Sequence, residues 1–304
     1  MRNCLLSTLT YFDMFHYPLT ADELYAFCAK AVDRQKLEVE LSEMVSEQLI
    51  FHTDRFYSLC PGNQLAERRI KGNKAAISQL QIASKIAWLI SLFPYVRGVG
   101  ISGSLSKNFA DESSDIDFFI ITAKDRLWIS RTILMLFRKI WVPFGRGKWF
   151  CMNYWVDEAG IEIVEKNIFT AIEIATLVPM CGEKTFEDFF AANEWTRNYL
   201  PNYVVNNKFL RVKNNWLMKR LLETVFDLPI FNKLERRLML ITGKRYKKKT
   251  EDGQLNKKGI LIGMQASERY SKHNPQNFQF VLLKRYEQKL NDLLQKVSKH
   301  AAIF

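Results

Sequence analysis

Apolar and polar residues in the first sixty positions alternate with the period of an α-helix. Apolar side chains recur at helical spacing over residues 5–15 and again over residues 33–48. Between these segments, Thr20 and Glu23 have the spacing of a capping box, which predicts the start of a second helix. A short alternating stretch after the third segment predicts a β-hairpin. Three helices followed by a hairpin predict a winged helix over residues 1–62.

The rest of the chain divides into three regions with different patterns. They are a helical connector at residues 63–95, a core with a small mixed sheet at residues 96–182, and a helical C-terminal region at residues 183–304. The predicted fold class is therefore α+β. Within the core, residues 149–156 predict a strand, and residues 161–164 predict a strand that returns beside it. Residues 244–258, which include three consecutive lysines, predict an exposed loop.

One stretch of the core has the features of a ligand site. A short apolar strand ends at Ser102, and Gly103-Ser104 then predicts a turn into a short helix. Glycine lets a ligand approach the backbone closely, and a helix N-terminus presents free N–H groups to an anion. The turn therefore predicts a cradle for phosphate groups.

Two aspartates follow this turn at the start of a second apolar strand. Asp115 and Asp117 are separated by Ile116, and alternation along a strand places both carboxylates on one face. Two aligned acids beside a buried strand are costly without a positive partner, and a divalent metal ion is the usual one. We therefore expect Mg²⁺ or Mn²⁺ at Asp115 and Asp117. The alternative is a surface loop that ends in a solvated aspartate pair.

Gly103, Ser104, Asp115 and Asp117 together resemble the signature of the DNA polymerase β-like nucleotidyltransferase superfamily. That signature is Gly-Ser, a spacer of similar length, and a strand that carries Asp-hydrophobic-Asp. The order of the four regions is also similar to that of a bacterial group of proteins with this domain. The resemblance implies metal-dependent transfer of a nucleoside monophosphate from a nucleoside triphosphate (NTP) to a hydroxyl group, and it leaves the acceptor unidentified.

Members of this superfamily that use two metal ions generally supply a third acid from a neighbouring strand. The corresponding residue here is Asn153, which can ligate through its carbonyl oxygen but adds no charge. Glu162 and Asp157 are possible replacements. We favour Glu162, because it would face Trp155 across the predicted hairpin, whereas Asp157 fits a surface position in the turn. If neither acid reaches the metal ions, the protein would bind nucleotide with little or no turnover.

Three further residues are candidates for contact with the nucleotide. Ser114 precedes the aspartates in the motif, and Lys107 lies on the predicted short helix. Arg131 lies on the predicted helix that follows the Asp-x-Asp strand, and a guanidinium group suits phosphate oxygens.

Positive charge is concentrated in the last third of the chain. The net charge is +12, and residues 205–304 contain 22 Lys and Arg against eight Asp and Glu. This asymmetry predicts either an anionic partner there, such as nucleic acid, a phosphorylated acceptor or a membrane surface, or basic helix faces in solvent. The predicted third helix is acidic, so docking to another protein or domain is favoured over DNA binding. A nucleotide sensor and a nucleic-acid-binding regulator remain alternatives to an enzyme.

Cysteine usage and hydropathy indicate the compartment that we expect. The five cysteines are odd in number and form no Cys-x-x-Cys pair, so the sequence predicts neither a zinc site nor a disulfide framework. No apolar run has the length of a transmembrane helix, and the N-terminus lacks the features of a signal peptide. We therefore expect a cytoplasmic protein without a transmembrane segment.

Overall fold

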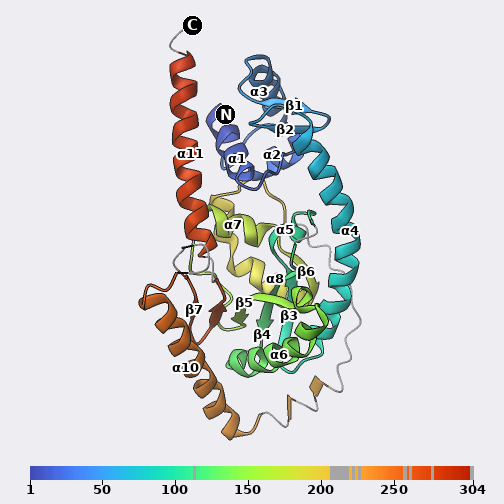
Figure 1. Ribbon diagram of the computed structural model, residues 1–304, viewed down its shortest axis with the longest axis vertical. Coiled ribbons are helices and arrows are strands. Elements are labelled where there is room, and N and C mark those ends of the chain that lie inside the picture. Colours follow the sequence, from blue (N-terminus) through green and yellow to red (C-terminus); the bar gives the residue numbers. More distant parts are fainter. Residues whose placement is uncertain are drawn as a thin grey trace.

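The N-terminal part of the computed structural model consists of three helices and a small sheet (Figure 1). The structure describes residues 1–111, 114–205, 219–220, 223–224, 227–255, 259, 262–274 and 277–301. Helices α1 (Arg2–Asp13), α2 (Ala21–Phe27) and α3 (Arg34–Ser46) precede the antiparallel strands β1 (Phe51–Thr53) and β2 (Phe56–Ser58). The capping box is confirmed, because Glu23 N–H donates to Thr20 Oγ1 at 3.2 Å and Thr20 N–H donates to Glu23 Oε2 at 2.9 Å. The three helices and the hairpin predicted from the sequence are confirmed.

A disulfide joins Cys4 in α1 to Cys28 at the end of α2. The expectation of no disulfide was therefore wrong for this pair. The two residues are 24 positions apart, and only the packing of α2 on α1 brings their Cα atoms to 5.9 Å, a separation that suits a disulfide. Spacing along the chain gives no signal for such a contact.

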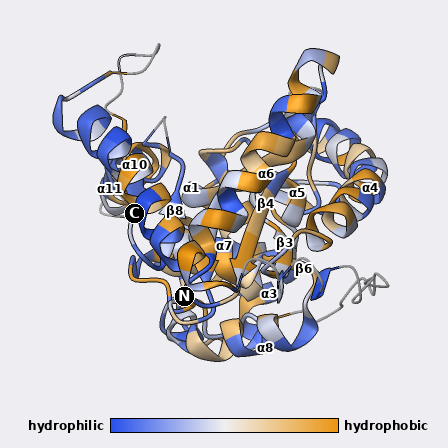
Figure 2. Cartoon of the chain, turned by 90° about the horizontal axis from the view of Figure 1, so that it is seen from below, coloured by the Kyte–Doolittle hydropathy of each residue, from blue (hydrophilic) through white to orange (hydrophobic). Residues whose placement is uncertain are grey.

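A mixed sheet of six strands forms the centre of the molecule, with the order β6-β3-β4-β5-β8-β7. The strands are β3 (Val96–Ile101), β4 (Asp117–Thr122), β5 (Cys151–Asp157), β6 (Val178–Cys181), β7 (Gln265–Ala266) and β8 (Tyr270–Lys272). Only β4 and β5 run parallel among these neighbours. Figure 2 shows hydrophobic residues gathered along β4 and the helix α6 (Leu127–Trp141) at the centre. This architecture confirms the predicted α+β class with a mixed sheet.

Helices surround the sheet and connect it to the N-terminal part. They are α4 (Gln64–Ser91), α5 (Gly103–Ser106), α7 (Ile168–Ala175), α8 (Glu183–Ala192), α10 (Pro229–Glu251) and α11 (Phe278–Ala301). Short 3₁₀ helices lie at Val142–Phe144, Gly147–Phe150 and Glu194–Asn198. Helix α4 descends along one side of the molecule, and α11 runs beside α1 on the other (Figure 1). None of the helices in the described part of the chain has the length and hydropathy needed to cross a lipid bilayer.

Two predicted elements are wrong. Residues 161–164 form no strand, because Ile163 N–H donates instead to Asn193 Oδ1 at 2.9 Å and that segment turns towards the end of α8. The free edge of β5 pairs with β8 from the C-terminal region, which was expected to be helical. Residues 244–251 belong to α10 and not to an exposed loop; residues 256–258 of that prediction lie outside the described part.

Candidate functional site

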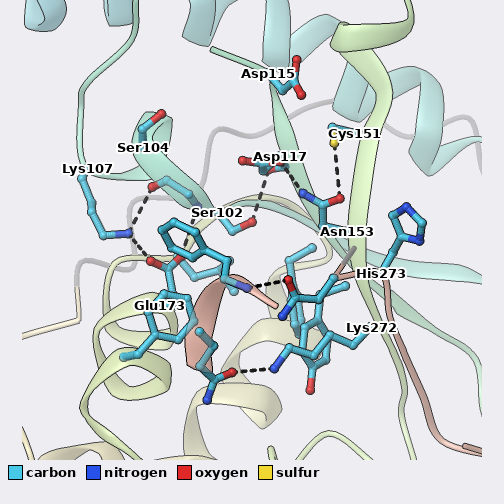
Figure 3. A pocket seen from close by; sticks show the side chains of 18 of the residues that line it. Ser102, Ser104, Lys107, Asp115, Asp117, Cys151, Asn153, Glu173, Lys272 and His273 are labelled. Atoms are coloured by element: carbon cyan, nitrogen blue, oxygen red, sulfur yellow. Dashed lines mark hydrogen bonds and ion pairs between the residues drawn. The ribbon is translucent and has the colours of Figure 1, made fainter. Parts of the chain in front are cut away.

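A pocket of about 740 Å³ lies where the N-terminal helices, the central sheet and the C-terminal region meet. Phe15 and Tyr17 line it from the N-terminal part, Asp115 and Asp117 from the sheet, and His273 from the segment after β8. Figure 3 shows polar side chains that converge in this pocket from several elements. Residues far apart in the sequence therefore share one site.

The Gly103 turn forms one wall of the pocket. Gly103 has φ +70°, and a Cβ atom there would lie 2.5 Å from Asp117 Oδ2, so only glycine fits. The backbone N–H of Gly103 donates to Glu173 Oε2 at 3.2 Å, and Lys107 Nζ donates to Glu173 Oε1 at 2.7 Å. The turn thus holds a carboxylate of the chain itself at the place where phosphate groups were predicted. Ser104, in the same turn, also lines the pocket.

Glu173 was missed by the sequence analysis. It lies on α7, and its distance from the motif along the chain gave no local signal. Lys107, in contrast, lies where it was predicted, on the pocket wall beside the turn, with its ammonium group shared between Glu173 and the carbonyl oxygen of Gly103.

The two aspartates lie at the start of β4. Asp117 is the first residue of the strand, and Asp115 is an exposed residue in the loop before it, separated from Asp117 by the buried Ile116. Burial raises the pKa of Asp117 to about 7; a hydrogen bond with Cys151 opposes this shift, and the negative charges of Glu173 and Asp115 add to it. This carboxylate therefore lies where nearby positive charge is insufficient to stabilise its ionised form.

Asn153 lies beside Asp117 on the neighbouring strand. The pairing of β4 with β5 shifts register between Phe118 and Phe119, and Asn153 is the residue without a partner at this irregularity. Its Nδ2 donates to Asp117 Oδ1 at 2.5 Å, and its Oδ1 accepts a hydrogen bond from Cys151 Sγ at 3.3 Å (Figure 3). Asn153 thus occupies the position predicted for it next to the acidic pair.

Neither predicted replacement for a third acid reaches this position. Glu162 is an exposed residue that pairs with Lys166 at 2.7 Å, and it does not line the pocket. Asp157 is fully buried, which corrects the expectation of a surface residue. It binds Arg269 Nη1 at 2.7 Å and accepts from Asp125 N–H at 3.1 Å, so it stabilises the far end of β5.

The donor set at the aspartates has the chemistry of a site for a hard divalent cation. Asp115 and Asp117 supply two carboxylates, and Mg²⁺ and Mn²⁺ prefer such oxygen ligands. The amide group of Asn153 presents its nitrogen to Asp117, and its oxygen is bound by Cys151. Across the described residues, no group of three or more His, Cys, Asp or Glu side chains is arranged to hold a metal ion. The site therefore offers two acids, and a neutral amide stands where a third acid was expected.

The predicted contacts Ser114 and Arg131 also line the pocket. Ser114 Oγ accepts a hydrogen bond from the backbone N–H of Asp111 and donates one to the Asp111 carboxylate, both at 2.9 Å. Ser114 therefore orders the loop that leads to Asp115. Arg131 lies deep in the wall and donates to Tyr246 Oη at 2.6 Å.

Further pocket residues were not expected from the sequence. Arg138 lines the pocket from α6, and Lys272 and His273 line it from the C-terminal region. Lys272 forms an ion pair with Glu165, and the backbone N–H of His273 donates to Asn153 O at 2.9 Å. Their positions depend on the pairing of β8 with β5.

Comparison of the chain with protein-family models, with curated proteins and with solved structures finds no match.

Proposed function

We propose that this protein is a metal-dependent nucleotidyltransferase, which transfers a nucleoside monophosphate from an NTP to a hydroxyl acceptor. The supporting observation is that the Gly103 turn, Asp115, Asp117 and Asn153 meet in one pocket. An anion-binding turn beside an acidic pair is the combination that phosphoryl-group chemistry requires.

In this proposal, the residues of the turn bind the leaving part of the nucleotide. The N–H group of Gly103 and the ammonium group of Lys107 now bind Glu173, and they would bind the β- and γ-phosphates instead. The acceptor oxygen forms a new bond to the α-phosphorus while the bond to pyrophosphate breaks, and the proton of the acceptor hydroxyl passes to solvent. The turn orients pyrophosphate as the leaving group.

Asp115 and Asp117 would hold Mg²⁺ or Mn²⁺, and the carbonyl oxygen of Asn153 would join them if its amide group turned away from Cys151. When bound, the ion supplies positive charge that stabilises the attacking and leaving oxygens. Desolvation and neighbouring negative charge raise the pKa of Asp117, and a bound cation would relieve both effects.

Calorimetric titration with NTPs, with and without Mg²⁺, tests the site. We expect Mg²⁺-dependent binding in the wild type and its loss in the Asp115→Ala, Asp117→Ala double variant. The matched control is Glu187→Ala, Asp188→Ala, which removes two exposed acids of α8 that lie outside the pocket. Unchanged binding in the first double variant would reject the site.

A second candidate function is a nucleotide sensor with little or no turnover. Asn153 in place of a third acid and the occupation of the Gly103 turn by Glu173 favour it. Incubation with α-labelled NTPs and cell extract separates the two functions. Transfer of label to an acceptor supports the enzyme, whereas tight binding without transfer supports the sensor.

We also propose that the N-terminal part is a winged helix used for docking within or between proteins. The acidic face of α3 is partly occupied within the chain, because Arg2 pairs with Glu40 and Glu47, each at 2.9 Å. Tyr17 Oη donates to the backbone oxygen of Lys107 at 2.6 Å, which ties this part to the pocket. For the basic C-terminal region we propose an anionic partner, for which nucleic acid is the less favoured candidate.

A further inference from the structure

A group of positively charged side chains lines the pocket on the side of Asn153. Arg131, Met135 and Arg138 lie at intervals of four and three residues on α6, so one helix face points into the pocket. His273 lines the same region from the segment after β8. Two guanidinium groups and an imidazole thus share one wall of the pocket, which we call the positive wall. The opposite side carries the carboxylate of Glu173.

The two arginines have unused hydrogen-bonding capacity. Arg131 is only 9% exposed, and neither its Nε nor the buried Nε of Arg138 has a hydrogen-bond partner. Within the described part of the chain, neither guanidinium forms an ion pair, although Arg131 donates one hydrogen bond to Tyr246. A buried N–H group without a partner is costly, so a ligand that accepts from these groups would be stabilised.

Tyr246 connects Arg131 to His273. Its Oη accepts a hydrogen bond from Arg131 at 2.6 Å and is hydrogen-bonded to His273 Nδ1 at 3.2 Å. Desolvation lowers the pKa of His273 to about 4, although part of the side chain is exposed, and the positive charges of Arg131 and Arg138 add to this effect. The unpartnered Nε–H groups of Arg131 and Arg138 are both donors.

The positive wall and the Gly103 turn lie on different sides of the aspartates. Figure 3 shows Lys107 and Glu173 on one side of Asp117, and Asn153 and His273 on the other. Displacement at the α-phosphorus requires the attacking and leaving oxygens to be in line. If pyrophosphate leaves from the turn, the acceptor attacks from the side of Asn153.

We infer that Arg131, Arg138 and His273 form a second anion-binding subsite, which receives a phosphate or carboxylate group of the acceptor. The acceptor would thus be a molecule that ends in such a group, because only a group that enters the pocket can reach the recessed Arg131. Guanidinium groups can donate hydrogen bonds to the oxygen atoms of both a planar carboxylate and a tetrahedral phosphate. The assignment to the acceptor rests on the proposed function, whereas the anion site itself does not.

Titration with inorganic phosphate, without nucleotide or Mg²⁺ and at constant ionic strength, tests the subsite. We expect saturable binding in the wild type that weakens about tenfold or more in Arg131→Gln and Arg138→Gln, because each removes charge-assisted hydrogen bonds. Lys139→Gln is the matched control, since Lys139 is an exposed cation next to Arg138 that does not line the pocket. Acetate in place of phosphate distinguishes a carboxylate subsite from one that requires a phosphate.

Three outcomes would overturn the inference. They are no saturable binding of either anion in the wild type, unchanged binding in both arginine variants, and loss of binding in Lys107→Gln with retention in Arg138→Gln. If Arg131→Gln fails to fold, Arg138→Gln still decides, because phosphate affinity equal to that of the wild type in this variant would reject the subsite.

The assignment to the acceptor is tested separately with Mg²⁺ and NTP. We expect Arg138→Gln to leave NTP affinity unchanged, and a parallel loss would assign the subsite to the triphosphate instead. Failure of the proposed function would appear as an NTP affinity that is the same in the Asp115→Ala, Asp117→Ala double variant as in the wild type. That result would leave the phosphate titration unaffected, so the two failures are distinguishable.

Discussion

The substitution Asn153→Asp tests how the pocket balances charge. It replaces an N–H donor, 2.5 Å from Asp117 Oδ1, by a second carboxylate. Two unit charges about 3 Å apart repel by about 5 kcal/mol at an effective dielectric constant of about 20. Protonation of one carboxyl group relieves part of this cost, because the pair then shares a proton. Including the lost hydrogen bond, we expect a loss of about 2–4 kcal/mol in the free energy of unfolding without metal ions.

The same change should strengthen metal binding. The third carboxylate raises the negative charge of the donor set, and ligand charge is a main determinant of affinity for hard divalent cations. A cation between the carboxylates would also remove the repulsion that destabilises the metal-free variant. We therefore expect Mg²⁺ to raise the unfolding temperature of Asn153→Asp more than that of the wild type.

Thermal unfolding in EDTA and then in a Mg²⁺ series measures both effects. In EDTA the unfolding temperature of Asn153→Asp should fall by about 4–16 °C, given about 2–4 °C per kcal/mol for a chain of a few hundred residues. Asn153→Ala removes the amide without adding charge, so Mg²⁺ should not restore it. Asn63→Asp, at the exposed N-cap of α4, controls for an added carboxylate. An Asn153→Asp variant that is as stable as the wild type in EDTA, or that Mg²⁺ fails to stabilise, would refute the reasoning.

Three other changes test the geometry. Gly182→Ala should destabilise the protein by several kcal/mol more than Gly62→Ala in denaturant unfolding. Both residues have positive φ, which costs alanine about 1–2 kcal/mol. A Cβ atom at Gly182 would also lie 2.1 Å from a backbone oxygen of β3, whereas one at Gly62 would meet no atom within 4 Å. Equal losses would contradict this. Glu173→Gln should raise NTP affinity in calorimetry, because it weakens the group that occupies the Gly103 turn; reduced affinity would instead indicate that Glu173 contributes to binding. His273 should titrate near pH 4 in NMR and stay neutral from pH 7 to 5, because burial and the charges of Arg131 and Arg138 lower its pKa; titration near pH 6.5 would contradict both effects.

The part of the site that the sequence predicted is local. Gly103, Ser104, Asp115 and Asp117 belong to one strand–turn–strand segment, whose geometry follows from glycine at the turn and from alternation along the strand. Asn153 could be placed because β5 is the next strand of the core, and it lies beside Asp117 as expected. Short-range rules were sufficient for these five residues.

The remainder of the site depends on which segment packs against β5. Residues 161–164 begin with an alternating Ile-Glu-Ile pattern, whereas residues 270–272 are Tyr-Ser-Lys, so periodicity favoured the segment that does not pair with β5. The structure pairs Tyr154, Trp155 and Val156 with β8, and this pairing brings His273 to the backbone of Asn153. Glu162 was favoured as a third acid only because the wrong segment had been chosen.

Contacts between distant regions also explain why the N-terminal part matters to the pocket. Tyr17 binds the backbone of Lys107, the residue that pairs with Glu173 beside the Gly103 turn. On the other side, Asp13 at the end of α1 forms an ion pair with Lys289 of α11. Helix α11 begins at Phe278, which lines the pocket close to the segment that carries His273. The N-terminal part is therefore connected both to the Gly103 turn and to the segment that carries His273, so a partner that displaces it would disturb both sides of the pocket.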